Sequence, residues 1–201
     1  MDITSLEALR GLYELPQDRA VRKQLPALDP HCRRFVELSP FVVMSSVGAS
    51  GRLDASPRGG SPGFIKAPDA KTLLIPDAPG NNRLDSLENM VVTGRVGLLF
   101  LVPGVDETLR VNGTAVLSLD PLLIEACRDA RRAPKLVIRV TVEEAYLHCA
   151  KALMRARLWE LSAQVSRAVL PSLGEMVKDQ LQLSAPGETQ DEMLQYYQGA
   201  L

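Results

Sequence analysis

The chain has little of several features that mark common functional classes. Its 201 residues carry 23 Lys and Arg against 24 Asp and Glu, so no broad basic surface is available for nucleic acid or an anionic membrane. Its three cysteines stand at unrelated spacings, which predicts neither a disulfide framework nor a metal site. No apolar run approaches membrane-spanning length, and the first residues are acidic where a secretion signal would be basic. These absences predict a cytoplasmic protein.

What remains is the composition of a globular protein, with 46% hydrophobic residues and a length that favours one domain over residues 1–201. Residues 1–38 have apolar positions at helical spacing, which predicts two or three short helices. Residues 39–149 carry short apolar runs separated by Pro and Gly turns, a pattern typical of a closed antiparallel barrel. Residues 150–201 return to a helical pattern, broken at Pro171.

Within the predicted barrel, two further segments have helical character. The expected strands are 41–47, 52–58, 71–75, 96–102, 107–117 and 135–146. The expected helices within this region are 86–92 and 121–132. We therefore predict a mainly β protein of the α+β class, with helices at both ends of the chain.

The segment from Pro76 to Asn89 carries a distinct chemistry, because it joins a strand to a helix through a polar turn. Asn81 and Asn82 tolerate the left-handed backbone that such a turn needs, and the next helix would open with free backbone N–H groups. Arg83 adds a bidentate donor suited to phosphate. An ordinary capped helix with a solvated arginine explains the same segment.

An ordered set of motifs resembles the FMN-binding split-barrel proteins related to pyridoxamine 5′-phosphate oxidase. The set covers about 35–159, and each motif alone is weak. The matching pieces are 54–59 (DASPRG), 72–77 (TLLIPD), 80–86 (GNNRLDS), 95–100 (RVGLLF), 107–113 (ETLRVNG), 148–155 (HCAKALMR) and 158–159 (LW). The resemblance implies an antiparallel split β-barrel and a homodimer with FMN at the subunit interface.

The resemblance also implies which residues contact the cofactor. The phosphate would be held by Ser56, Arg58, Asn82, Arg83 and Ser86. Two arginines and a helix N-terminus are also what a doubly charged phosphate requires on chemical grounds.

The rest of the cofactor would meet other matched positions. Pro76 and Asp77 would run along the ribityl chain, and Thr108, at a position where the family has glutamine, would lie by the polar edge of the ring. A late segment that reaches the flavin site, from the same subunit or from its partner, would supply Lys151, Arg155 and Trp159. For these three, a helix with a basic face and a buried tryptophan is an equal alternative.

The chain departs from the vitamin-forming oxidase itself. That enzyme's basic strand ending in lysine and its C-terminal arginine–histidine constellation are not found, and Lys66 falls in a loop. We therefore expect an FMN-dependent oxidoreductase acting on an unidentified small organic substrate, with no catalytic side chain assigned.

Two alternatives belong to other classes. One is a non-catalytic flavin or haem carrier, for which His31 or His148 would be the imidazole ligand, and the other is a deazaflavin-dependent reductase. We expect His148 and Cys149 to be a core histidine and a buried thiol rather than a catalytic or metal-binding pair.

Overall fold

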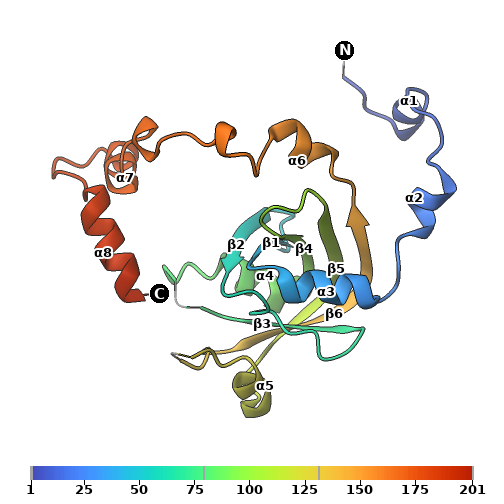
Figure 1. The fold of residues 1–201 in the computed structure, drawn as a ribbon, viewed down its shortest axis with the longest axis horizontal. Helices are drawn as coiled ribbons and strands as arrows, with labels where there is room; N and C mark the ends of the chain where they lie inside the picture. The colour runs from blue at the N-terminus through green and yellow to red at the C-terminus, as the bar shows by residue number, and fades with distance from the viewer. Residues whose placement is uncertain (1, 79, 131, 201) are drawn as a thin grey trace. The chain divides into compact units, whose positions relative to one another are not determined.

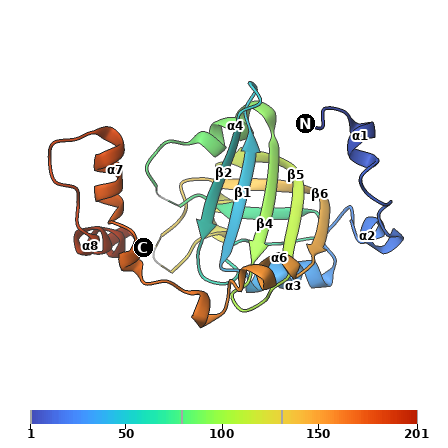
Figure 2. The ribbon, with the colours of Figure 1, turned by 90° about the horizontal axis from the view of Figure 1, so that it is seen from above.

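The computed structural model describes residues 2–78, 80–130 and 132–200, and the chain divides into two compact units, 1–155 and 156–201 (Figure 1). The first unit is built on a sheet of antiparallel strands in the order β2-β1-β4-β5-β6-β3 (Figure 2). Their bounds are β1 Phe41–Val47, β2 Leu53–Gly59, β3 Thr72–Pro76, β4 Arg95–Leu101, β5 Thr108–Ser118 and β6 Val137–His148.

Buried and more exposed residues alternate along the strands, and the buried side chains form the core. In β1, Val42, Met44 and Ser46 are buried while the residues between them are more exposed, so one face of the strand points inward. In β4, Val96 and Phe100 repeat the pattern, and the long strands β5 and β6 continue it. The sheet curls around these side chains, which confirms the predicted antiparallel split β-barrel with flanking helices.

Short helices join and flank the strands. Their bounds are α1 Leu6–Arg10, α2 Asp18–Arg22, α3 Pro30–Leu38, α4 Asp85–Thr93, α5 Pro121–Ala126 and α6 Lys151–Ala156. The Asp29 carboxylate accepts the Cys32 backbone N–H at 2.7 Å and so caps α3, which buries Cys32 and Val36 in the core. Burial raises the pKa of the Cys32 thiol to about 12.

The helix expected over 121–132 is shorter than predicted. It ends at Ala126, because the buried Cys127 packs with Leu74 and Val137 in a small second cluster. The chain then turns, with the Arg132 backbone N–H donated to the Asp129 carboxylate at 2.7 Å. Packing, rather than helical propensity, sets the end of this helix.

Two segments outside the named strands also pair with the sheet. Leu25 forms an antiparallel bridge with Ala145 near the end of β6, and Lys23 donates from Nζ to the Leu147 carbonyl at 2.8 Å. Lys66 bridges to Leu74 in β3 through two backbone hydrogen bonds. Both segments therefore extend the pairing beyond the strands themselves.

The second unit consists of two 3-10 turns, 161–163 and 167–169, followed by α7 Leu173–Leu181 and α8 Gln190–Ala200. The helical pattern predicted for residues 150–201 is therefore wrong over residues 161–170, because extended residues at Gln164 and Leu170 end each turn. Met193 of α8 is buried, and Ser172 before α7 donates to the Glu188 carbonyl at 2.6 Å. Within the described ranges, no helix has both the length and the hydrophobicity needed to cross a bilayer.

Candidate functional site

A row of polar side chains lines one side of β2. Asp54, Ser56 and Arg58 alternate along the strand and are half-buried, while the residues between them are exposed. Arg58 lies opposite Val42 in the register with β1, and Val42 is fully buried. Because directly paired residues point to the same face of a sheet, the polar row emerges on the inward-facing side of the barrel.

The turn between β3 and α4 brings a second set of polar groups to this row. Asn82 and Leu84 have φ values of 59° and 61°, so both adopt the left-handed backbone. The Asn81 side-chain oxygen accepts the Arg83 backbone N–H at 3.1 Å, which closes the turn. Helix α4 then begins at Asp85, and its N-cap Leu84 forms no side-chain capping bond. The first turn of α4 therefore lacks the usual side-chain acceptor at its N-cap.

Polar contacts fix α4 against the β1–β2 hairpin. Asn89 donates from Nδ2 to Ser46 Oγ at 3.0 Å, and Thr93 donates from Oγ1 to the Val47 carbonyl at 2.8 Å. A Cβ at Gly48 would lie 2.7 Å from Asn89 Oδ1, so a side chain at this position would displace the Asn89 amide. These contacts hold the start of α4 beside β2.

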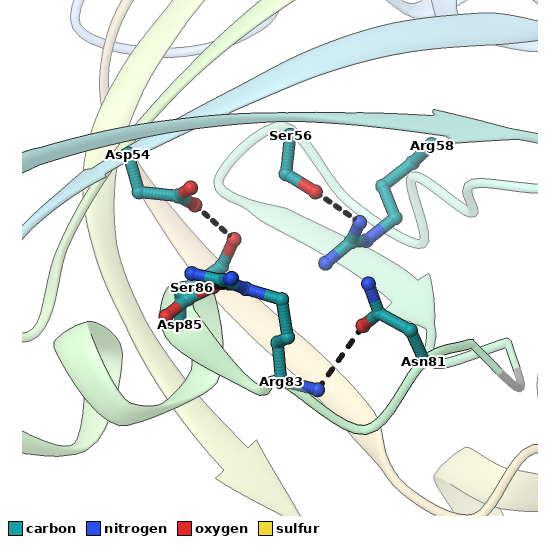
Figure 3. A network of polar contacts seen from close by, with 7 residues as sticks. All are labelled: Asp54, Ser56, Arg58, Asn81, Arg83, Asp85 and Ser86. Carbon is teal, nitrogen blue, oxygen red and sulfur yellow. Dashed lines mark hydrogen bonds and ion pairs between the residues drawn. The ribbon is translucent and has the colours of Figure 1, made fainter. Parts of the chain in front are cut away.

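The two sets of groups meet between β2 and the start of α4 (Figure 3). Ser86 donates from Oγ to Asp54 Oδ2 at 2.5 Å, which joins the helix to the strand. Arg58 donates from Nη1 to Ser56 Oγ at 2.5 Å and to the Pro57 carbonyl at 3.0 Å. These side chains form a polar cluster, in which the Arg58 guanidinium and the Ser56 hydroxyl on β2 lie across from the Ser86 hydroxyl on α4.

Arg83 is held differently from Arg58. Its Nε lies 2.8 Å from Asp85 Oδ2, and 72% of its side chain is exposed. Hydrogen bonding within this pair raises the pKa of Arg83 and lowers the pKa of Asp85. The Arg83 guanidinium is therefore already engaged by a carboxylate.

Asp77 follows β3 and adds a half-buried carboxylate near the cluster. Burial raises the pKa of Asp77, and the positive charges of Arg58 and Lys135 oppose that rise without cancelling it. Its backbone N–H is donated to the Leu136 carbonyl at 3.1 Å, which fixes the start of the turn. Asp77 therefore faces the same positive charge that an incoming anion would use.

The remaining predicted site residues are not all brought together. Pro76 ends β3, and Asn82 is exposed within the turn. Thr108 begins β5 and is only 4% exposed, but the next residue, Leu109, points into the core, so Thr108 faces the other side of the sheet from Arg58. Lys151 and Arg155 are exposed on α6, and Trp159 belongs to the second unit.

Sequence reasoning missed the acidic members of the cluster. Asp54 could have been found from its period-two spacing with Ser56 and Arg58, and Asp85 from its place two residues after Arg83. The expectation for His148 and Cys149 is wrong, because both are exposed at the end of β6 where the strand leaves the core. Among the described residues, no group of three or more His, Cys, Asp and Glu side chains is placed to hold a metal ion.

A groove of about 390 Å³ lies elsewhere on the sheet. Its charged and amide side chains are paired with one another, since Arg95 lies 3.1 Å from Glu143 and Asn112 donates to Glu144 at 3.0 Å. This groove offers no excess of positive charge. The cluster between β2 and α4 is the better candidate for binding an anion.

Comparison with known proteins places the chain in a broader context. A family model described as pyridoxamine 5′-phosphate oxidase matches residues 28–149. A solved structure of a HupZ variant from Group A Streptococcus is 17% identical, with a TM-score of 0.50, covering 60% of this chain and 98% of its own. No curated protein sequence matches the chain.

Two further solved structures are similar at lower TM-scores. An FMN-binding protein from Syntrophomonas wolfei is 10% identical with a TM-score of 0.45, covering 72% of this chain and 97% of its own. A protein from Clostridium acetobutylicum related to general stress protein 26 is 14% identical with a TM-score of 0.45, covering 59% and 85%.

Proposed function

The chain belongs to the pyridoxamine 5′-phosphate oxidase family, and from that premise we propose that it binds FMN with the phosphate between β2 and the start of α4. The observation that carries this proposal is the meeting of Ser56 and Arg58 on β2 with Ser86 on α4 (Figure 3). Phosphate groups are bound in proteins by arginine, by hydroxyl groups and by helix N-termini. All three kinds of donor are present at this place.

The residues present fit the phosphate end of the cofactor. Arg58 is oriented by Ser56 and by the Pro57 carbonyl, so its guanidinium is held in position before any ligand arrives. Asn82 and Arg83 lie on the turn that leads into the uncapped start of α4. Pro76 and Asp77 would line the path away from the phosphate, where a ribityl chain would run.

We propose that the protein is an oxidoreductase acting on a small organic substrate. FMN would supply the redox chemistry, and the chain would supply binding, orientation and shielding from water. No catalytic side chain is assigned. The chain lacks the cationic constellation for a substrate phosphate noted above, so pyridoxamine 5′-phosphate is not the proposed substrate.

A homodimer with FMN shared between subunits is part of the proposal. Arg58 and Thr108 occupy the same end of the strands, because Arg58 pairs with Val42, Val42 with Phe100, and Phe100 with Leu109. They nevertheless face opposite sides of the sheet. A ligand held by Arg58 would therefore meet Thr108 most directly if a second copy supplied it, and we propose the same for Lys151 and Arg155 on α6.

An absorption spectrum of the protein as purified tests the cofactor assignment. We expect flavin bands near roughly 370 and 450 nm, because an isoalloxazine ring is the chromophore. A Soret band would instead support a haem carrier, with the exposed His148 as an accessible ligand. A bound chromophore that shows neither the flavin band near roughly 450 nm nor a Soret band would support a deazaflavin enzyme.

A further inference from the structure

The hydrogen bond between Ser86 and Asp54 decides what Ser86 can offer to a ligand. A serine hydroxyl has one hydrogen to donate and lone pairs that accept. The Ser86 hydrogen is committed to the Asp54 carboxylate at 2.5 Å, and Ser86 is only 4% exposed. To a ligand bound between β2 and α4, Ser86 therefore offers its lone pairs rather than its hydrogen (Figure 3).

A fully ionised phosphate has only acceptor oxygens, so it would meet a serine lone pair and a nearby carboxylate. A phosphomonoester that keeps one proton can donate its P–OH to Ser86. We propose that this site binds its phosphate ligand together with one proton, shared among the phosphate, Ser86 and Asp54. The proposal rests on the proposed function, and it assigns Asp54 a role in selecting the protonation state of the ligand.

The balance of charge in the cluster agrees with this assignment. Asp54 and Arg58 lie on β2, and Arg52 precedes the strand; at the start of α4, Arg83 is paired with Asp85, whose pKa is also lowered by the charge of Arg52. Asp77, near Arg58 and Lys135, is a further carboxylate. Figure 3 draws two guanidiniums and two carboxylates, and one of the guanidiniums, that of Arg83, is already paired, so a dianion would meet less free positive charge than the number of arginines suggests.

Proton linkage gives this proposal a distinct signature. The second pKa of a phosphomonoester is about 6. If the complex contains one proton, affinity is constant below that pH, where the free ligand already carries the proton. Above it, the dissociation constant rises about tenfold per pH unit, because a proton must be taken up from solution. A site that binds the dianion behaves in the opposite way, with affinity improving up to about pH 6 and constant above it.

The experiment measures the dissociation constants of FMN and of inorganic phosphate from pH 5 to 8.5 by calorimetry, with riboflavin as the probe that lacks a phosphate. We compare the wild type with Asp54→Asn and Asp54→Ala. Asparagine imitates the protonated carboxyl group, and alanine frees the Ser86 hydrogen. The matched control is Asp85→Asn, which removes the same charge from the same cluster, at a carboxylate that is hydrogen-bonded to Arg83, whereas the Ser86 hydroxyl is hydrogen-bonded to Asp54.

For the wild type we expect the dissociation constant of FMN to rise about 50-fold between pH 6 and 8, because half of the free ligand is already deprotonated at pH 6. In both Asp54 variants we expect it to change less than about threefold over that range, with tighter binding than wild type at pH 8. Asp85→Asn should keep the wild-type slope.

Three results would overturn the proposal: a wild-type affinity that is constant above pH 6, a slope that persists in both Asp54 variants, or a slope lost in Asp77→Asn but kept in Asp54→Asn. Failure of FMN to bind, with phosphate still showing the slope, would overturn the proposed function alone. If neither probe binds, both are overturned.

Discussion

At the residue scale, the two arginines of the cluster are not equivalent. Arg58 is half-buried and oriented by Ser56 and the Pro57 carbonyl, whereas Arg83 is largely exposed and paired with Asp85. A guanidinium held in place loses little freedom on binding a ligand, while one engaged by a carboxylate must first exchange that partner. We therefore expect the two arginines to contribute unequally to ligand binding.

We expect Arg58→Ala to weaken FMN binding more than Arg83→Ala, and the double variant to lose FMN on purification. Hydrogen bonds to charged groups contribute about 1.5–3 kcal/mol, so removal of Arg58 should weaken binding by roughly 10- to 100-fold. Titration monitored by flavin fluorescence measures each affinity. Arg34→Ala is the control, because Arg34 is an exposed, ion-paired arginine on α3. Unchanged affinity in the double variant would show that the phosphate binds elsewhere.

The sequence could identify several members of the cluster, because residue type and position suffice for them. Arg58 on a strand, and Arg83 and Ser86 after a strand-to-helix turn, are residue types that commonly contact phosphate. The bond from Ser86 to Asp54 was not predictable, since it joins residues 32 positions apart whose proximity depends on how α4 packs on the β1–β2 hairpin. Likewise, the exposure of Cys149 depends on where β6 leaves the core.

At the element scale, β5 and β6 carry an irregularity that depends on one glycine. Their register shifts between Asn112 and Gly113, so Glu143 is the extra residue of a bulge. A Cβ at Gly113 would lie 2.0 Å from the Thr141 carbonyl oxygen, which is backbone and cannot turn aside. The two longest strands can approach at this point because position 113 lacks a side chain.

Gly113→Ala should therefore lower the free energy of unfolding by about 2 kcal/mol or more, since overpacking a buried site typically costs this much. Gly80→Ala is the matched control, because a Cβ there meets nothing within 4 Å. We expect that variant to lie within about 0.5 kcal/mol of wild type. Urea unfolding followed by circular dichroism measures both. Equal stability of the two variants would mean that the bulge relaxes without cost.

Element boundaries show where sequence patterns stop being sufficient. The strands were predictable because apolar alternation and turn residues fix them locally. Helix α5 ends at Ala126 instead of Arg132 because Cys127 packs against β3 and β6, a contact that no local pattern records. The region before α7 forms separate turns although its leucines and valines suggested a helix.

At the scale of the whole molecule, the shared site predicts the oligomeric state. Arg58 and Thr108 face opposite sides of one sheet, so a cofactor contacting both positions requires two copies. Analytical ultracentrifugation at micromolar concentration should therefore show a dimer of the 21.9 kDa chain. The measurement should be paired with flavin absorbance across the sedimenting boundary. A monomer that carries one flavin per chain would contradict the shared site.

The two edge strands of the sheet have features that discourage pairing with strands of other molecules. β2, the first strand in the order, contains Pro57, which supplies no amide hydrogen to an incoming chain. Lys66 pairs with Leu74 of β3, the last strand, and Leu25 pairs with Ala145 of β6. A strand with an unpaired edge can pair with a strand of another molecule, and such pairing begins fibrils. Pro57 lies between Ser56 and Arg58 and therefore discourages intermolecular strand pairing right beside the polar cluster.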